Sequence, residues 1–469
     1  MIFDGYTVMA KQRLALLFPG FVLTLALGPV WADDAQLPLS AVQGPTPQLS
    51  APRKQKLPSI HIAAAVGWKG EGTPQAVAPG TSVNAFARGL RHPRWIYSLP
   101  DGDVLVAETD TPSKPDDYKG IEGKLYQKVQ KRAGSGKNPS ANDITLLRDT
   151  DGDGVADQRT VFISGLNSPL GMALVGDSLY VADTDAVLRF PYATGQTQIT
   201  APPTKLTDLP AGSRNHHWTK SLVASPDGTK LYVGVGSNSN AGENGIEAET
   251  DRAAVWEIDT ATGEHRVFAS GLRNPVGLAW EPKTHDLWVS VNERDQLGSD
   301  VPPDYMTALK RGAFYGWPYS YFGQHIDDRV EPQRPDLVSS AVVPDYALGP
   351  HTASLGLCSA SRTSLPPQLQ YGMFVGQHGS WNRKPLSGYK VIFVPFDAGK
   401  PSGLPVDVLT GFLDKNGKAQ GRPVGVVIDK HGDLLVADDV GNAVWRVSGS
   451  AAEPGRRASA ETSGKRVAD

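Results

Sequence analysis

A short apolar run recurs six times along this chain, and each run follows a turn that contains Gly, Asp or a similar small or polar residue. Examples are DGDVLVAETD from Asp101 and HGDLLVADDVGN from His431. The runs lie about 50 to 90 residues apart, a spacing typical of propeller blades that combine four strands with variable loops. They are led by Leu105, Leu179, Leu231, Leu287, Met373 and Leu434. We therefore expect an all-β fold, a six-bladed β-propeller with inserted loops.

A second repeat precedes the first in four of the six blades, where a proline stands just before a further strand. These are Pro93, Pro169, Pro275 and Pro423. In a propeller this strand is the innermost one, and it begins at the channel mouth, where side chains of different blades converge. At the equivalent points the third blade has HHWTKSLVASPDG and the fifth has PHTASLGLCSA. His217 and Thr352 thus replace the proline turn.

The two ends of the chain read differently from the repeats. Residues 1–32 resemble a secretory signal peptide, because Lys11 and Arg13 precede an apolar run that ends in Val-Trp-Ala. An uncleaved anchor stays as the alternative, although two prolines and a glycine interrupt the run. We expect a linker or N-terminal arm over 33–78, the propeller over 79–449, a disordered tail over 450–469, and a periplasmic or secreted protein.

The composition limits the classes of partner that this protein is expected to bind. The chain has 46 basic and 49 acidic residues and a net charge of −3, so no overall field favours nucleic acid. No later segment is apolar enough to span a bilayer, so no membrane span is expected in the mature protein. The 50 glycines and 37 prolines favour many short strands over long helices. Long insertions around residues 114–134 and 298–345 are expected to shape a binding site.

An acidic loop, DTDGDGVAD, follows Arg148. It places Asp149, Asp151, Asp153 and Asp157 at the first, third, fifth and ninth positions of a calcium loop. Thr160 stands where a bidentate glutamate would complete that loop. The sequence therefore indicates a structural calcium site or, as the alternative, a solvated acidic turn.

Four motifs in a fixed order, RNHHWTKSLVASPDG, GLRNPVGLAW, VNERD followed by YGWPY, and GQHGSWNRKPLSGYKV, carry a family resemblance. The chain resembles the glucose/sorbosone dehydrogenase family, six-bladed propellers that bind pyrroloquinoline quinone (PQQ), from about Pro79 to Val447. The sorbosone dehydrogenase branch is the most similar. The resemblance implies a PQQ-dependent oxidation of a sugar or aldehyde, with electrons passing to a periplasmic acceptor.

The same resemblance assigns roles to single residues. Oxidation by hydride transfer needs a base near the substrate hydroxyl, and imidazole suits neutral pH, so His217 is the expected base and Arg273 its catalytic partner. From the residues alone, a structural histidine that bonds a backbone carbonyl is the favoured interpretation of His217.

The cofactor carries three carboxylates and an ortho-quinone, which arginine forks suit. The implied cofactor-binding residues are Arg94, Arg273, Asn274, Thr352, Arg383, Lys390 and Arg422. The alternative for each arginine is a solvated turn residue. A Ca²⁺ ion bound with the quinone would lie near NERDQLG, where Glu293 and Asp295 are the nearest side chains.

Two other classes of function remain open at this point. One is a non-catalytic propeller that binds a carbohydrate or a protein, because a fold alone does not decide function. The other is a calcium-dependent propeller lactonase or hydrolase, which would need metal-binding carboxylates at the channel. No GxGxxG fingerprint stands between a strand and a helix, so nothing supports a nicotinamide cofactor.

Overall fold

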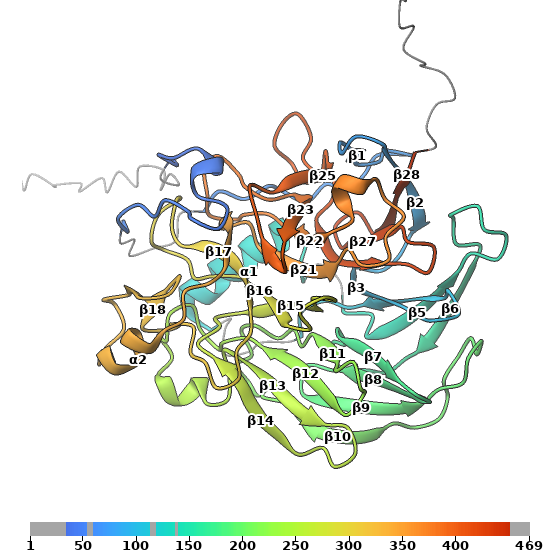
Figure 1. Cartoon of the computed structure of the whole chain (residues 1–469), viewed down its shortest axis with the longest axis horizontal. Helices are drawn as coiled ribbons and strands as arrows, with labels where there is room; N and C mark the ends of the chain where they lie inside the picture. The colour runs from blue at the N-terminus through green and yellow to red at the C-terminus, as the bar shows by residue number, and fades with distance from the viewer. Residues whose placement is uncertain (1–33, 54–59, 113–118, 137–138, 451–469) are drawn as a thin grey trace, which may run out of the picture.

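The computed structural model describes residues 34–53, 60–112, 119–136 and 139–450. Within them, strands form seven antiparallel sheets: six are arranged around a common centre (Figure 1), and the seventh is a separate pair of short strands. The expected signal peptide and all but the first residue of the expected tail lie outside the described residues. No helix of the described part is long and apolar enough to cross a membrane.

Each blade is a meander of four neighbouring strands. The first blade has β3 (Pro93–Ser98), β4 (Val104–Glu108), β5 (Asp143–Arg148) and β6 (Gln158–Ile163), and the second has β7 (Met172–Val175), β8 (Ser178–Ala182), β9 (Ala186–Pro191) and β10 (Thr204–Asp208). The third has β11 (Leu222–Ala224), β12 (Lys230–Val235), β13 (Ala254–Asp259) and β14 (His265–Ser270).

The remaining blades follow the same order. The fourth has β15 (Pro275–Trp280), β16 (Leu287–Val291), β17 (Pro303–Ala308) and β20 (Tyr346–Pro350). The fifth has β21 (Ser354–Ser359), β22 (Gly372–Gln377), β23 (Lys390–Asp397) and β25 (Val406–Thr410), extended by β1 (Gln75–Ala76) and β24 (Lys400–Pro401). The sixth has β26 (Pro423–Ile428), β27 (Leu434–Asp438), β28 (Ala443–Gly449) and β2 (Thr81–Arg88).

The propeller prediction is confirmed strand by strand. All six apolar runs are the second strand of a blade, and Pro93, Pro275 and Pro423 are the first residues of innermost strands, while Pro169 stands just before β7. The innermost strands contact one another around a closed ring: β3, β7, β11, β15, β21, β26 and back to β3. Their starting ends therefore meet at one face, and we call the residues at these starts and in the adjoining loops the rim.

The ring is closed by pairing the two ends of the propeller. Strand β2 is the outer strand of the last blade and runs antiparallel to β28, with Thr81 opposite Gly449 and Arg88 opposite Ala443. This arrangement satisfies the backbone groups of β28, the last strand in the chain. The blades pack through buried faces that include Trp445 and Trp288, both close to fully buried.

Several segments are inserted between the strands of the blades. The insertion around 114–134 contains the helix α1 (Gly120–Ala133). The expected insertion 298–345 is partly wrong, because it contains the blade strand β17 besides the short pair β18 (Ser320–Tyr321) and β19 (His325–Ile326) and the helix α2 (Pro335–Ser340). Three short 3-10 turns complete the elements: η1 (Leu39–Ala41), η2 (Ile246–Glu249) and η3 (Pro367–Leu369).

The N-terminal arm, residues 34–53 and 60–74, is held along the rim over its described length. Val42 and Ala63 are buried, and Gly44 forms a β-bridge with Ala347 and Ala65 one with Ala419. These contacts are made largely by the backbone, so they leave no repeating side-chain pattern in the sequence. The segment expected to be a linker or N-terminal arm is thus held against the propeller at these positions.

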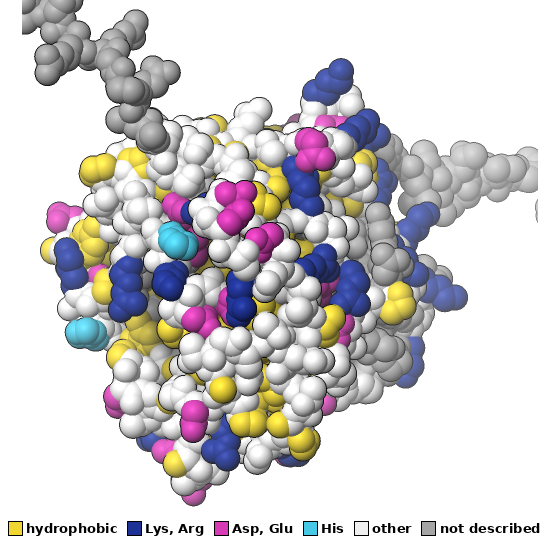
Figure 2. Space-filling model, turned by 90° about the vertical axis from the view of Figure 1, so that its right-hand side faces the viewer, with side chains coloured by type: hydrophobic (Ala, Val, Ile, Leu, Met, Phe, Trp, Pro, Cys, Tyr) yellow, Lys and Arg dark blue, Asp and Glu magenta, His cyan; other side chains and the backbone are white. Residues whose placement is uncertain are grey.

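The outer surface mixes charges of both signs. Figure 2 shows acidic and basic side chains interspersed over one side of the propeller, with no face of a single sign. This distribution agrees with the near-neutral composition and gives that side no extended cationic patch for a polyanion to bind.

Candidate functional site

The rim brings together side chains from five of the six blades. His217 stands before β11, Arg273 and Asn274 before β15, Thr352 before β21 and Arg422 before β26, while Arg94 is the second residue of β3. All but His217 are buried, which is unusual for arginine and needs specific partners. The alternative of solvated turn arginines is therefore wrong for Arg94, Arg273 and Arg422.

His217 is oriented by Ser237, in the loop after β12. Its Nδ1 lies 2.8 Å from the Ser237 carbonyl oxygen and 3.0 Å from Ser237 Oγ. A carbonyl only accepts hydrogen bonds, so Nδ1 carries the proton and the lone pair of the neutral ring is on Nε2. The hydrogen bond to a backbone carbonyl that a structural histidine would form is therefore present. The same bond fixes the tautomer in which Nε2 is free of a proton, as a general base requires.

Gly236 allows Asn274 to approach His217. A Cβ atom at this position would collide with both Asn274 Oδ1 and the Cβ of His217, so the two side chains meet over a glycine. Asn274 is buried and its Oδ1 has no hydrogen-bond partner. An unsatisfied buried amide beside a histidine is a candidate contact for a ligand.

Arg273 is fixed by acceptors on two neighbouring loops. Its Nε donates to the Asn240 carbonyl at 3.1 Å, Nη2 donates to Asn240 Oδ1 at 3.0 Å, and Nη1 donates to the Glu293 carbonyl at 2.7 Å. Asp295 lies 3.8 Å from Nη2. These contacts hold the guanidinium plane at the rim beside Asn274.

Three carboxylates lie close together near Arg273: Glu293 and Asp295 of NERDQLG, and Asp304 of β17. Burial raises the pKa of Glu293 to about 8 against the attraction of Arg273, and its Oε1 has no partner. Burial opposes ionisation of Asp295 as well, but His351, Arg273 and the Asn382 amide hold its pKa below the ordinary value. Burial also raises the pKa of Asp304. This is a buried cluster of acids in which one oxygen, Glu293 Oε1, has no partner.

Thr352 belongs to the same cluster. Its Oγ1 donates to Asp304 Oδ2 at 3.0 Å and lies 2.8 Å from Ser354 Oγ. The side chain is fully buried. Thr352 therefore ties the start of β21 to the carboxylates near Arg273, and in this structure the hydroxyl is used within the protein.

Arg383 lies on the loop before β23 and faces the same region. Nε donates to the Ser299 carbonyl at 2.8 Å and Nη1 to the Pro385 carbonyl at 2.9 Å, while Asp300 lies 3.6 Å from Nη2. Burial lowers the pKa of Arg383. The neighbouring Asn382 donates to Asp295 Oδ1 at 2.7 Å, so this loop is joined to the cluster near Arg273.

Arg94 and Arg422 mark the opposite side of the rim. Arg94 Nη1 donates to Asp439 Oδ2 at 2.7 Å, and its guanidinium lies 5.9 Å from the ring centroid of Trp218, the residue after His217. Arg422 Nη2 donates to the Ala63 carbonyl at 3.3 Å, and its guanidinium lies over the Tyr389 ring. In both arginines Nε is buried without a partner.

Lys390 is not part of this group. It is the first residue of β23, and its ammonium pairs with Asp407 of the outer strand β25 at 2.6 Å. The expected role of Lys390 in holding cofactor carboxylates thus finds no support, because its ammonium contacts an outer strand of its own blade.

The sequence alone did not single out several rim residues. They are Asn240, His351, His378, Asn382 and Asp439. The acid that recurs at the end of second strands in AETD, ADTD and ADDV is Asp438, and Asp439 stands where the other two segments have threonine, so no repeat signalled Asp439. Burial lowers the pKa of His378 to about 4 despite the opposing attraction of Asp439, so this ring is neutral and donates to Asp439.

The acidic loop after β5 forms part of a calcium geometry. Asp149, Asp151 and Asp153 can bring one ligand atom each within 4.8 Å of one another, the sole such group among the residues that the structure describes. Asp157 instead accepts a hydrogen bond from Thr150. Asp151 and Asp153 are exposed, as they would be in the alternative, a solvated acidic turn.

The rim fits a planar anionic cofactor. Four buried arginines surround it, and buried polar atoms without partners are left on Arg94, Arg422, Asn274, Glu293 and Asn382. Such atoms are costly unless a ligand or water meets them. Donors for carboxylates and a carboxylate for a cation are thus both present.

A family model described as TrAA12-like matches residues 140–305 and 336–450, more than half of the chain. The chain belongs to the TrAA12-like family. The matched residues include His217, Arg273, Asn274, Thr352, Arg383 and Arg422. The resemblance to PQQ-dependent dehydrogenases is confirmed at family level, and the assignment to the sorbosone branch stays a prediction.

Curated relatives cover parts of the chain. A pyrroloquinoline quinone-dependent pyranose dehydrogenase of Coprinopsis cinerea is 26% identical over 317 residues, which covers 52% of this chain and 42% of that protein. The aldose sugar dehydrogenase YliI of Escherichia coli is 22% identical over 204 residues, 39% of this chain and 53% of that protein. An uncharacterized protein of Borreliella burgdorferi is 28% identical over 51% of this chain and 62% of that protein. The chain spans less than two thirds of each relative.

Solved structures share the fold over a larger span. The PQQ domain of the Coprinopsis cinerea pyranose dehydrogenase in its holo form gives a TM-score of 0.63 at 21% identity, covering 83% of this chain and all of that one. A calcium structure of a Trichoderma reesei AA12 enzyme gives 0.64 at 17% identity, with 83% and 99% covered. At these identities the likeness shows the fold.

Proposed function

We propose that this protein is a PQQ-dependent dehydrogenase that oxidises a sugar or aldehyde, of the aldose or sorbosone type. The observation that carries the proposal is the position of His217, whose tautomer is fixed for proton abstraction beside Asn274 and Arg273 at a rim with four buried arginines. Relatives that carry the cofactor in their names support it.

His217 would act as the base. Oxidation of a hydroxyl or an aldehyde hydrate removes a proton from oxygen and a hydride from carbon, and Nε2 is the nitrogen able to take the proton. When bound, the quinone supplies the hydride acceptor and Ca²⁺ the Lewis acid that polarises it. Asn274 Oδ1, an unsatisfied acceptor next to His217, would orient a second hydroxyl of the substrate.

The arginines would hold the cofactor. Arg94 and Arg422 each have an unused Nε–H, and Arg273 and Arg383 add positive charge on the opposite side. Such forks suit carboxylates. Thr352 would position the start of β21 rather than contact the quinone, because Asp304 already accepts its hydroxyl.

The calcium would lie near Glu293. This side chain has the unpaired Oε1, and Asp295 is two residues further on. We further propose that the protein is exported, as its first 32 residues suggest, and that its electrons pass to a periplasmic acceptor.

The alternatives have weaker support. For a calcium-dependent hydrolase, the rim carboxylates of the described residues would have to converge on a metal, yet no three of them meet within 4.8 Å. A non-catalytic binding module would need neither the fixed tautomer of His217 nor the buried arginines.

The test is reconstitution. Purified protein is incubated with PQQ and Ca²⁺, and dye reduction is followed over aldoses, sorbosone and simple aldehydes, while PQQ binding is measured by fluorescence quenching. We expect PQQ binding and turnover of at least one compound class. Absence of both PQQ binding and turnover would refute the proposal.

A further inference from the structure

The inserted helix α1 carries positive charges along one side. Lys124, Lys131 and Arg132 each stand three or four residues from Lys128, and all four side chains are exposed. Residues at these spacings are neighbours on a helix surface. The buried Val129 falls on another side of the helix. We call Lys124, Lys128, Lys131 and Arg132 the basic face of α1.

The basic face is a local exception in a slightly acidic chain. The net charge of the chain is −3, yet the segment from Lys119 to Ala133 has five basic residues and a single acid, Glu122. Within the described part of the chain, the four side chains of the basic face form no ion pair. Their charges are therefore available to a partner.

Helix stability does not account for this arrangement. Lys131 and Arg132 lie in the last turn, where cations interact favourably with the helix dipole. Lys124 and Lys128 lie in the middle of the helix, and like charges four residues apart repel and destabilise it. An acidic surface bound to the basic face would relieve that repulsion.

Leu125 adds an apolar contact beside the cations. Its side chain is 49% exposed and stands three residues from Lys128. An apolar side chain bordered by charges is typical of a protein interface, whereas a helix that lies in a membrane surface needs a broad apolar face. Among the side chains of α1 that the structure describes, Leu125 is the one exposed large apolar residue.

The N-terminal arm joins the end of α1 to the proposed cofactor site. The Ala65 amide donates to the Arg132 carbonyl at 3.0 Å. Two residues earlier, the Ala63 carbonyl accepts from Arg422 Nη2 at 3.3 Å. The basic face therefore ends close to one of the arginines assigned to the cofactor.

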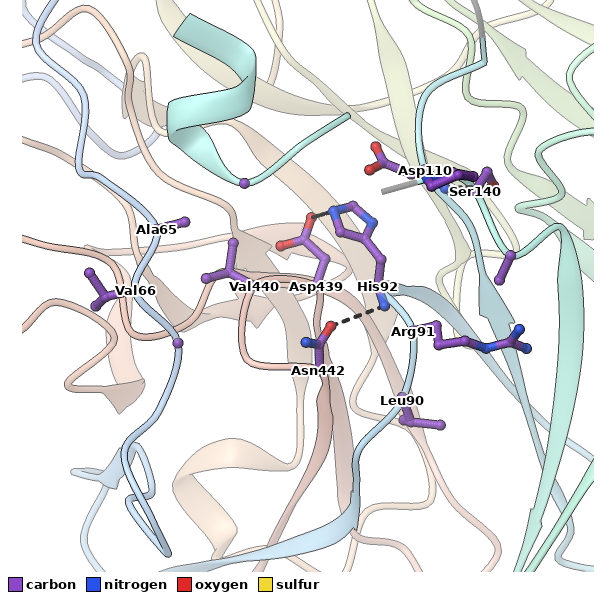
Figure 3. Close-up of a pocket in the computed structure, with 14 residues that line it drawn as sticks. Ala65, Val66, Leu90, Arg91, His92, Asp110, Ser140, Asp439, Val440 and Asn442 are labelled. Atoms are coloured by element: carbon purple, nitrogen blue, oxygen red, sulfur yellow. Dashed lines mark hydrogen bonds and ion pairs between the residues drawn. The ribbon is translucent and has the colours of Figure 1, made fainter. Parts of the chain in front are cut away.

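A second contact joins α1 to the other side of that site. A Cβ on Gly134, directly after α1, would press on Val440. The preceding residue, Asp439, accepts from Arg94 Nη1 at 2.7 Å. Figure 3 shows α1, the pale helix at the top of the view, above Val440 and Asp439. The helix is thus placed beside the rim between the first and the last blade.

The proposed function needs an acceptor for its electrons. Oxidation of an aldose to the lactone releases two electrons and two protons. Two haem proteins can each take one electron as Fe³⁺ becomes Fe²⁺, while the protons pass to the solvent. Such an acceptor must bind beside the rim, and opposite charge on the two surfaces speeds the encounter.

We propose that the basic face of α1 is the docking surface for an acidic redox protein that accepts one electron at a time. The inference rests on the proposed function, which it extends by naming the chemistry of the acceptor and its binding surface. The four cations attract the partner, and Leu125 supplies an apolar contact beside them.

The experiment reverses the charge of the basic face. In the double variant Lys124→Glu and Lys128→Glu, the new carboxylate at position 128 faces Lys131 and Arg132, and Glu suits a helix as well as Lys does. The helix should therefore keep its stability, which melting temperatures check.

The matched control carries the same change of net charge at the other end of the blades. It is the double variant Lys283→Glu and Lys400→Glu, two exposed lysines on the turns after β15 and β23. These turns meet, because a Cβ on Gly399 would contact Thr284.

The probes are a basic cytochrome c and the same protein with its lysines succinylated, which makes it acidic. Protein loaded with PQQ and Ca²⁺ is reduced by an aldose, and reduction of each cytochrome is followed by absorbance at low and at high salt. We expect the succinylated form to react faster at low salt and to lose this advantage at high salt. Charge reversal on α1 should lower its second-order rate constant by about tenfold or more, while the control variant and the reaction with a small uncharged dye stay unchanged.

Three results would overturn the docking surface. One is an equal rate constant in the wild type and the α1 variant. Another is an equal loss in the control variant, which would assign the effect to overall charge. The third is binding to phosphatidylglycerol vesicles that the α1 variant abolishes while its reaction with succinylated cytochrome c is unchanged, because the face would then bind a membrane.

Failure of the proposed function is distinguishable from failure of the docking surface. If no aldose is oxidised, the proposed function fails, and calorimetry of oxidised succinylated cytochrome c with the purified protein still tests the surface. Tighter binding by the wild type and the control variant than by the α1 variant supports it, and equal binding by all three overturns it.

Discussion

At the scale of single residues, several buried polar groups without partners lie at or beside the rim. Asn274, Asp439 and Glu293 each retain an unsatisfied oxygen at or beside the rim. The sequence could predict His217, Arg273 and Arg422 because they stand at repeat-equivalent positions. It could not predict Asp439 or Asn382, because their importance arises from contacts between blades that are distant along the chain.

Asp183 provides a residue-scale test of burial near the rim. It follows β8, is buried, and has an unpaired Oδ1, and burial raises its pKa to about 7. The unfolded carboxyl titrates near pH 4, so the folded state holds the extra proton between about pH 4 and 7. Its contribution to stability therefore falls as pH rises through this window and is level above it.

Replacing Asp183 by Asn removes this penalty. We expect the variant to gain stability relative to the wild type by about 1 to 3 kcal/mol more at pH 8 than at pH 4. Urea unfolding at both pH values measures the difference. An equal effect of the substitution at the two pH values would show that Asp183 does not titrate in this range.

At the scale of elements, the strands were predictable and the arm was not. The apolar runs marked every second strand, because a buried strand needs consecutive apolar residues. The arm is held by backbone bridges such as Gly44 with Ala347 and by single side chains such as Trp68. Neither produces periodicity, so the sequence predicted only a linker or an N-terminal arm and none of its contacts.

Trp68 tests whether the arm supports the rim. Its Nε1 donates to Asp438 Oδ2 at 2.7 Å, and Asp438 Oδ1 accepts the Arg422 amide at 2.7 Å. We expect Trp68→Phe to cost about 1 to 3 kcal/mol of stability, because a buried carboxylate loses a donor, and to weaken PQQ binding because Arg422 loses its support.

A matched control is available on the fourth blade. Trp280 donates its Nε1 to the Ala224 carbonyl at 2.7 Å, at the end of β15 that lies away from the rim. Trp280→Phe should also lower the melting temperature but leave PQQ affinity unchanged. If both variants bind PQQ like the wild type, the arm has no role in positioning Arg422.

At the scale of the whole molecule, stability depends on closing the ring. The first and last propeller strands pair side by side, and Ser82 Oγ lies 3.1 Å from Ser448 Oγ although the residues are 366 positions apart. The repeats predicted six blades, but which terminus completes the last blade is decided by contacts between the two ends of the propeller. Pairing of β2 with β28 could only be seen in the structure.

A disulfide between β2 and β28 should stabilise the closed propeller. The double substitution Ser82→Cys and Ser448→Cys is expected to raise the free energy of unfolding by about 2 to 4 kcal/mol under oxidising conditions. Melting curves with and without dithiothreitol measure the effect, and Ser82→Cys alone is the control. Cys358 should not interfere, because burial raises the pKa of its thiol. A melting temperature that does not depend on the reductant, in protein shown to be cross-linked, would argue against this closure.

The most direct test of the account is the single-turnover reduction of bound PQQ by an aldose, followed by absorbance in the wild type and in His217→Asn. Loss of a general base slows a chemical step by about 10² to 10⁴, so we expect that reduction of rate with an unchanged dissociation constant for PQQ. Equal rates in the two proteins, with PQQ bound to both, would contradict the role of His217 and with it the mechanism proposed for the rim.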